Sequence, residues 1–240
     1  MSLAPPVTTV LFDLDDTLFD HAATARAALA ATAAGRAALC AVPLETLYQR
    51  YSELLEEMHP RVMAGEMPYL AAREQRFQRL LAPYEGSLSG AEGQWVAEQH
   101  YGHYQRLRRP VPGALALLQA LKPVVKIGIV TNNRTAEQQE KLRFLGMDSL
   151  VDALITSEAV GVLKPDPAIY QVALTQLGAR PAQTVMVGDN WRADVLGSLA
   201  VGIRPVWLNR FGAARPLPPV AELASLEPLE ETYRHLISPA

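Results

Sequence analysis

The sequence predicts an α/β fold in which a parallel sheet is interrupted after its first strand by a helical insert. Short apolar strands alternate with helices from residue 112 onward, which is typical of a parallel sheet with helices on both faces. One further strand, VTTVLF at residues 7–12, lies far upstream of the others. The long stretch between them is rich in alanine and leucine and reads as helical. The predicted domains are therefore a sheet core of residues 1–19 and 110–240 and a helical domain of residues 20–109.

The helical domain is predicted from four segments. LETLYQRYSELLEEM, at residues 44–58, repeats apolar residues every three or four positions and so has one apolar face. The segments at 68–81 and 91–107 have a similar pattern. The segment at 23–39 is alanine-rich and has high helix propensity. We expect a four-helix insert.

The second half of the chain supplies the remaining strands and helices. Asp166 and Pro167 suit the N-cap and first turn of a helix, and Gly146 suits a helix C-cap. Residues 216–220 (PLPPV) read as a surface loop before a short C-terminal helix. The predicted strands are 124–131, 152–157, 184–188 and 203–209, and the predicted helices are 113–121, 135–146, 167–178 and 192–202.

Composition excludes several classes of protein. The net charge of −3 is spread along the 240 residues without a basic stripe, so we expect no nucleic acid polymer as a partner. No apolar run reaches the roughly 20 residues that a membrane helix needs, and no signal peptide is recognisable. The single cysteine, Cys40, has no partner for an internal disulfide and is expected to be packed inside. We expect a cytoplasmic protein, either a monomer or a homodimer.

Polar residues gather where the predicted strands end. In an open parallel sheet, binding sites form beyond the carboxyl ends of the strands, so residues that follow different strands meet there. One such residue alone would suit a helix cap, but several together predict a functional site. They are Asp13 and Asp15 after the first strand, Thr131 and Asn132 after the second, Lys164 before its helix, and Asp189 and Asp194 after the strand at 184–188.

Crowded carboxylates repel one another unless a cation lies among them. Asp13 and Asp189, with a backbone carbonyl, are ligands of the kind that Mg²⁺ prefers. A substrate phosphate would then contact the metal, Lys164 and the Thr131 hydroxyl. Asp13 is placed to attack phosphorus and form an acyl phosphate, because a carboxylate is a competent nucleophile there. Asp15, two residues later, would protonate the leaving group and later activate water.

Four motifs in order resemble the haloacid dehalogenase superfamily. DLDDT matches its DxDxT motif, and VTNN, LKPDP and GDNWRAD resemble its second, third and fourth motifs, so the likeness spans residues 13 to 194. The resemblance implies a Rossmann-like core with a helical cap between the first and second motifs. Implied roles are nucleophile for Asp13, acid/base for Asp15, Mg²⁺ ligands for Asp13, the Asp15 carbonyl and Asp189, phosphate binding for Thr131 and Lys164, a further hydrogen bond to phosphate or substrate from Asn132, and orientation of Lys164 or of the metal's water shell by Asp194.

Asp15 indicates which branch of the superfamily the chain resembles. A halide leaves without a proton, whereas an alkoxide needs one, so an acid at position 15 favours phosphate esters over haloacids. The spacing of GVLKPDPAIY and GDNWRAD is similar to that of nucleotide 5′-monophosphatases and N-acylneuraminate-9-phosphatases. The leading hypothesis is a Mg²⁺-dependent phosphate monoester hydrolase for a small metabolite, a nucleotide monophosphate or a sugar phosphate.

Two alternatives share these residues. A phosphosugar mutase of the β-phosphoglucomutase type has the same core and the same acid, and differs in how long its phosphoenzyme avoids water. A non-enzymatic, receiver-like phosphate-binding domain also combines aspartate, threonine and lysine, but such domains lack a helical insert.

Other polar residues carry weaker hypotheses. Arg61 lies in a segment bounded by Gly and Pro that we read as a loop, and is the candidate for substrate contact from the insert. Arg73 and Arg76 are substitutes for it, and each of the three otherwise suits a solvated surface. His100 and His103 suit a helix surface. Asp16 suits a turn, and Asp20 suits the N-cap of the helix that begins near His21.

Overall fold

The computed structural model describes residues 5–214, 217 and 219–237. The chain forms two compact units, which we call the sheet unit (Met1–Asp20 with Arg109–Ala240) and the helical unit (His21–Arg108). The chain passes from one to the other at residues 20/21 and 108/109, where the sequence placed the change at 19/20 and 109/110. That the first is a catalytic core and the second a cap stays a prediction.

The sheet unit contains a parallel sheet with the strand order β3-β2-β1-β4-β5-β6. Every neighbouring pair of strands is parallel, which confirms the predicted α/β fold. The edge strand β6 was not predicted, because three residues are too few to show an alternating pattern. The strands are β1 (Thr9–Phe12), β2 (Lys126–Thr131), β3 (Ala153–Thr156), β4 (Thr184–Gly188), β5 (Arg204–Leu208) and β6 (Ala221–Leu223).

The central strand β1 positions the site. All four of its residues are buried, as expected for a strand covered on both faces. Phe12 lies in register with Ile129 of β2 and Val187 of β4, so the residues that follow these strands emerge at one edge of the sheet. The strand order reverses direction between β1 and β4, which is the switch point where ligands bind in open α/β sheets.

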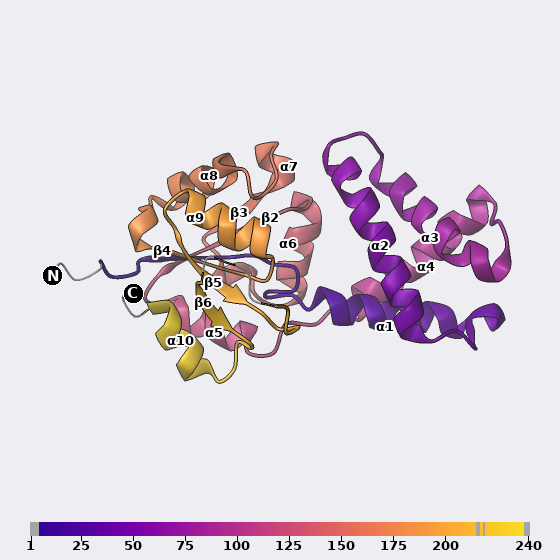
Figure 1. Ribbon diagram of the computed structural model, residues 1–240, viewed down its shortest axis with the longest axis horizontal. Helices are drawn as coiled ribbons and strands as arrows, with labels where there is room; N and C mark the ends of the chain where they lie inside the picture. The colour runs from indigo at the N-terminus through magenta and orange to yellow at the C-terminus, as the bar shows by residue number, and fades with distance from the viewer. Residues whose placement is uncertain (1–4, 215–216, 218, 238–240) are drawn as a thin grey trace. The chain divides into compact units, whose positions relative to one another are not determined.

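Helices cover both faces of the sheet. In Figure 1, α8 and α9 lie on one side of the strands and α5 and α10 on the other. On the α8 side, Leu11, Val130 and Met186 belong to one apolar cluster with Ile169 and Tyr170 of α8. The helices are α5 (Ala114–Leu121), α6 (Thr135–Phe144), α7 (Ser157–Val160), α8 (Pro167–Leu177), α9 (Gly197–Ala200) and α10 (Leu229–Ile237).

Local signals in the sequence explain where several helices begin and end. The Asp166 side chain accepts a hydrogen bond from the amide of Ala168, and Pro167 begins α8, which confirms that N-cap. Gly146 takes a φ of +67° two residues after α6 ends, a conformation that favours glycine. The segment before α9, Trp191–Leu196, is π-helical. The loop predicted at 216–220 falls partly outside the described residues.

The helical unit is fully described and contains the four predicted helices. A capping box, in which Ser89 and Glu92 satisfy each other's backbone amides, begins the last helix. Across the described residues of both units, no helix is long and apolar enough to span a bilayer. The helices are α1 (His21–Ala34), α2 (Leu44–Met63), α3 (Tyr69–Glu85) and α4 (Gly90–Arg106), with a short 3-10 turn at Ala37–Leu39.

Two expectations about the surface of the helical unit were wrong. His100 is buried, with its ring 4.7 Å from that of Phe77, centroid to centroid, and burial lowers the pKa of His100 to about 3. Arg76 is also buried and donates a hydrogen bond to the Tyr51 hydroxyl. His100 is separated by three or four residues from buried neighbours on both sides, so helical periodicity would have found it.

Two further expectations concerned the position of single residues in the helical unit. Cys40 is exposed, since it follows the short turn between α1 and α2 instead of lying in a helix that faces the core. Arg61 lies in the last turn of α2, because the helix continues through Pro60 and ends only at Met63. Its expected loop position was therefore wrong.

Candidate active site

The segment that follows β1 folds back on itself directly after Asp13. The Asp13 amide extends the sheet by donating to the Val187 carbonyl at 2.9 Å. Asp16 then takes a φ of +61°, which confirms the predicted turn and is a conformation that aspartate tolerates better than most residues. The Leu14 carbonyl accepts hydrogen bonds from the amides of the next turn, including Phe19 at 2.9 Å. The turn therefore holds Asp13 and Asp15 on a short backbone segment.

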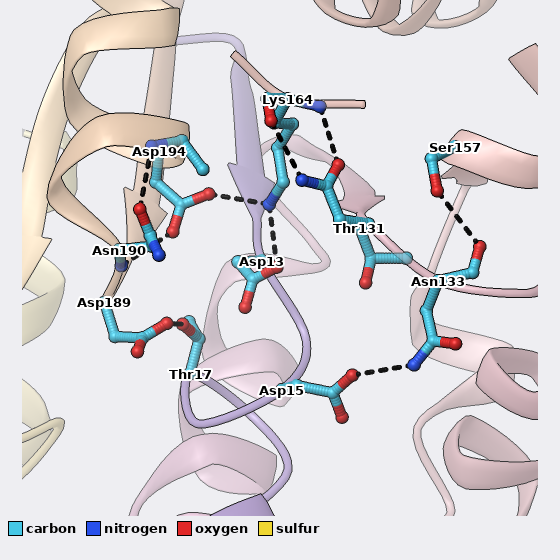
Figure 2. Close-up of polar contacts among 12 residues, drawn as sticks. Asp13, Asp15, Thr17, Thr131, Asn133, Ser157, Lys164, Asp189, Asn190 and Asp194 are labelled. Carbon is cyan, nitrogen blue, oxygen red and sulfur yellow. Dashed lines mark hydrogen bonds and ion pairs between the residues drawn. The ribbon is translucent and has the colours of Figure 1, made fainter. Parts of the chain in front are cut away.

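Lys164 lies between two carboxylates (Figure 2). Its Nζ is 2.7 Å from Asp13 Oδ1 and 2.6 Å from Asp194 Oδ1, and all three residues are buried. The side chain of Asn132 holds the backbone of Lys164, because its Nδ2 donates to the Lys164 carbonyl at 2.9 Å and its Oδ1 accepts from the Lys164 amide at 2.6 Å. Both polar atoms of Asn132 thus serve Lys164.

Asp189 and Asp194 enter the site from the end of β4. A Cβ atom on Gly188 would lie 2.3 Å from Asp194 Cγ, so only glycine allows the carboxylate to approach the strand this closely. The backbone N–H of Asn190 donates to Asp194 Oδ2 at 2.9 Å, as Figure 2 shows. The Thr17 hydroxyl donates to Asp189 Oδ1 at 3.4 Å. Asp13, Asp189 and Asp194 each offer an oxygen within 4.8 Å of the other two.

Burial and mutual repulsion change the protonation of these carboxyls. Burial raises the pKa of Asp13 to about 7, Lys164 opposes the shift, and Asp194 adds to it. Burial and the charge of Asp13 raise the pKa of Asp189 to about 9. Burial lowers the pKa of Lys164, but the charges of Asp13 and Asp194 outweigh this and raise it above its usual range. A clustered set of oxygen ligands with raised pKa values fits a hard divalent cation, whose charge would keep the carboxylates ionised.

The stability of the metal-free protein is therefore expected to fall as the pH rises. An aspartate in the unfolded chain titrates near 3.8, whereas Asp13 and Asp189 titrate at about 7 and about 9 in the folded chain. Between these values the folded state holds protons that the unfolded state has released, so raising the pH favours unfolding. Thermal unfolding with chelator at pH 6, 7.5 and 9 should give a falling Tm, and Mg²⁺ should raise the Tm most at pH 9.

Asp189→Asn is the control for this result, because it removes one of the two titrating carboxyls and should flatten the slope. A Tm in chelator that does not change with pH, or a Mg²⁺ effect of equal size at pH 6 and pH 9, would contradict the assignment of these carboxyls to a cation site.

Asp15 has a different environment from Asp13. Lys141 Nζ lies 2.6 Å from Asp15 Oδ1, while Gln138 Nε2 and Asn133 Nδ2 donate to Oδ2 at 3.0 and 3.2 Å. Gln138 Nε2 also donates to the Thr131 hydroxyl oxygen at 2.7 Å. Thr131 and Asp15 therefore share a neighbour on α6.

Sequence reasoning missed Lys141, Gln138 and Asn133. One signal was available: the chain has four lysines, and one of them, Lys141, lies in the helix directly after the Thr131 strand. Burial lowers the pKa of Lys141, but the charges of Asp15 and Glu137 outweigh this and raise it, so the side chain remains an ammonium.

The structure thus brings most of the predicted site residues together in the sheet unit. Lys164 forms ion pairs with Asp13 and Asp194, and Asp189 belongs to the same cluster of carboxylates. Asn132 forms a hydrogen bond with the Lys164 backbone. Gln138 links Thr131 to Asp15 through hydrogen bonds to both. Arg61 belongs to the helical unit, is half exposed, and has its Nε 3.9 Å from Glu66 Oε2. The Asp20 carboxylate forms ion pairs with Arg109 and Arg210, each at 3.2 Å.

Comparisons with known proteins agree with this architecture. The chain is 39% identical over 125 residues to the pyrimidine 5′-nucleotidase YjjG of Escherichia coli, a match that covers 51% of this chain and 56% of that one. It is 27% identical to the N-acylneuraminate-9-phosphatase of Rattus norvegicus, over 88% of each chain. A crystal structure of the putative hydrolase YfnB from Bacillus subtilis, bound to magnesium, has a TM-score of 0.76 at 23% identity and covers 95% of this chain and 99% of that one.

The match to a family model is the most direct of these findings. Residues 7–202 match the model of the haloacid dehalogenase-like hydrolases. This range contains all four motifs and both points at which the chain passes between the two units. Relatives with phosphatase names match across more than four-fifths of the chain. The chain therefore belongs to the haloacid dehalogenase-like hydrolase family, in its phosphatase branch.

Proposed function

We propose that the protein is a Mg²⁺-dependent phosphate monoester hydrolase that acts on a small metabolite through an aspartyl phosphate on Asp13. The observation that carries the proposal is the contrast between two carboxylates two residues apart. Asp13 is buried and bound to Lys164, whereas Asp15 is held by donors from α6 and keeps 28% of its side chain exposed. Neighbouring acids in different environments take different catalytic roles.

In the first step, an Asp13 oxygen attacks phosphorus and the ester oxygen departs. Lys164 binds Asp13 through Oδ1, which leaves Oδ2 to attack, and its ammonium reduces the repulsion between the carboxylate and the phosphate. The Thr131 hydroxyl donates to a phosphate oxygen, because its own oxygen already accepts from Gln138. Asp15 gives its proton to the departing alkoxide, and the alcohol product leaves.

In the second step, water attacks the phosphorus of the aspartyl phosphate. Asp15, now ionised, takes a proton from the water as the new bond forms, and Asp13 is released as a carboxylate together with inorganic phosphate. Asp15 ends the cycle protonated, so protons balance over the two steps. Asp194 keeps Lys164 in place throughout, and Asn132 does the same through the Lys164 backbone.

The residues that would hold Mg²⁺ are Asp13, the backbone carbonyl of Asp15, and Asp189. When bound, the ion would neutralise charge on the phosphate oxygens and on the crowded carboxylates. The cluster of carboxylates formed by Asp13, Asp189 and Asp194 supports this assignment. The structurally similar hydrolase from Bacillus subtilis was crystallised with magnesium bound.

We assign the sheet unit as the catalytic core and the helical unit as a cap that selects the substrate. Arg61 is the candidate for substrate contact from the cap, since it is a half-exposed cation whose only ion pair given by the described residues, to Glu66, is long. A nucleotide monophosphate or a phosphorylated sugar acid is the class that the two named phosphatase relatives suggest. We place the enzyme in the cytoplasm, as a monomer or homodimer.

A phosphate-release screen tests the proposal. The purified protein is incubated with nucleoside monophosphates, hexose phosphates and phosphorylated acids, with Mg²⁺ and with chelator. We expect phosphate release that depends on the metal and differs among the three groups. Isomerisation of a hexose 1-phosphate without phosphate release would show a mutase, and no turnover of any ester would favour a non-enzymatic phosphate-binding domain.

A further inference from the structure

Two residues of α6 contact the carboxylate that handles the proton. Lys141 Nζ lies 2.6 Å from Asp15 Oδ1, and Gln138 Nε2 lies 3.0 Å from Asp15 Oδ2. Residues three apart on a helix lie on the same face, so one helix surface contacts both oxygens. Asn133, just before α6, is a second donor to Asp15 Oδ2, at 3.2 Å.

The contact from Gln138 also reaches the predicted phosphate ligand. A glutamine amide nitrogen has two hydrogens, and Gln138 Nε2 donates one to Asp15 and one to the Thr131 hydroxyl oxygen, 2.7 Å away. Thr131 then has its own proton left for a phosphate oxygen. Gln138 therefore sets the distance between the residue that transfers the proton and a residue that binds the phosphate.

Stability alone does not explain why a lysine occupies the buried position 141. Its side chain is 1% exposed, lies 3.4 Å from Glu137 and has its ammonium 4.9 Å from the centre of the Phe19 ring. Bringing a charged pair out of water costs about as much as the pair returns, and apolar residues of similar size often replace such pairs without loss. A positioning function gives the buried ammonium a purpose that packing does not.

Proton transfer requires orientation as well as an acid. Asp15 must direct one lone pair at the leaving oxygen and later at the attacking water, and the side chain is 28% exposed, so packing restrains it little. Lys141 and Gln138 on α6, together with Asn133 just before it, occupy the other three lone pairs of its two oxygens. Without them, Asp15 would rotate among several rotamers and only a fraction of its conformations would reach the reacting oxygen.

We propose that Lys141 and Gln138 are positioning residues that hold Asp15 in the orientation needed for proton transfer, and that Gln138 couples this orientation to phosphate binding by Thr131. The inference rests on the proposed function, in which Asp15 is the acid and base. It makes a prediction that a structural role does not make, because only reactions that need the proton should suffer.

Lys141→Met is expected to separate the two steps of the reaction. With an alkyl phosphate, whose leaving group needs a proton, kcat should fall by about 10²-fold to 10⁴-fold, the usual size of general acid catalysis. With 4-nitrophenyl phosphate the leaving group departs unprotonated, so the first turnover should keep nearly its wild-type rate. Hydrolysis of the aspartyl phosphate still needs Asp15 as a base, so nitrophenolate should appear as a burst of about one equivalent per enzyme, followed by slow turnover.

Lys122→Met is the matched control. Lys122 forms an equally short ion pair, with its Nζ 2.6 Å from Asp152 Oδ1. Asp152 directly precedes β3, and neither residue belongs to one of the four motifs. This variant should keep the wild-type kcat for both substrates and show no burst. Thermal unfolding of both variants reports whether loss of an ion pair has changed the fold.

Gln138→Met provides a second variant, and carries the test if Lys141→Met does not fold. It should show the same burst, and the substrate concentration that gives the half-maximal burst rate should rise, since Thr131 loses its donor. Equal loss of the first turnover with both substrates, or no loss in either variant, would overturn this inference while leaving the phosphatase assignment intact. A wild-type protein that hydrolyses neither ester would instead overturn the proposed function.

Discussion

Asp13→Asn is expected to fold normally and to lose phosphate-ester hydrolysis by at least about 10⁴-fold, the scale seen when an enzyme loses its nucleophile. An amide has nearly the shape of the carboxylate but lacks the charge to attack phosphorus. Lys164 keeps its 2.6 Å contact with Asp194 in the variant, so the ammonium is not left alone. Phosphate release and trapping of the acyl phosphate measure the two consequences.

The stability of the same variant gives an independent measurement. Burial raises the pKa of Asp13 to about 7, so above that pH the ionised carboxyl opposes folding in the metal-free protein. Asp13→Asn should therefore have a Tm in chelator at pH 8 that equals or exceeds that of the wild type. Mg²⁺ should raise this Tm less than it raises the wild-type Tm, because one ligand is weaker.

Asp16→Asn is the matched control, with the same chemical change three residues downstream. Asp16 takes a φ of +61°, which asparagine also tolerates. Its carboxylate lies 3.9 Å from Arg210 and does not belong to the cluster of Asp13, Asp189 and Asp194. This variant should keep its activity. Turnover by Asp13→Asn at a rate near the wild type would rule out Asp13 as the nucleophile.

Lys164→Met is expected to lower both stability and activity. It leaves Asp13 and Asp194 buried without the ammonium that lies 2.7 and 2.6 Å from them. Breaking a buried pair by removing one partner costs about 3–5 kcal/mol, and loss of a charged group that stabilises the transition state costs about 10²-fold to 10³-fold in kcat. Denaturant unfolding in chelator and phosphate release with Mg²⁺ measure the two effects separately.

A second substitution distinguishes the two roles of Lys164. Adding Asp194→Asn removes one uncompensated carboxylate, so the double variant should recover part of the lost free energy of unfolding but none of the activity. Lys126→Met is the control, since its Nζ donates to the Leu177 carbonyl at 2.7 Å and, within the described part of the chain, makes no hydrogen bond or ion pair to a site residue. Lys164→Met with wild-type stability and kcat would contradict the central place of this lysine.

The sequence alone was sufficient for the fold class and for most of the candidate site. Apolar periodicity and helix propensity predicted the four helices of the insert, and short apolar runs predicted five strands, because each of these signals extends over enough residues to be recognised. The positions of Asp13, Thr131, Lys164 and Asp189 followed from one physical rule, that parallel strands end at the same edge of a sheet. The three-residue strand β6 was missed because it is too short to carry a pattern.

Residues without a motif were harder to interpret. His100 and Arg76 were assigned to the surface because their residue types are usually solvated, yet both are buried in the helical unit. Arg61 was assigned to a loop because proline usually ends a helix, yet α2 continues past Pro60. For His100 and Arg76, contacts with neighbouring helices, to Phe77 and Tyr51, outweighed the preference of the residue type.

What the sequence determined by itself is which residue types follow the predicted strands: two acids two residues apart, a lysine, a threonine and a second acidic motif, each in a recognisable context. What only the tertiary structure decided is how those groups are held. Lys141 and Gln138 are 126 and 123 residues from Asp15 along the chain and meet it because β1 and β2 are neighbours in the sheet. Such contacts depend on side-chain directions in three dimensions, which no local pattern in a single sequence records.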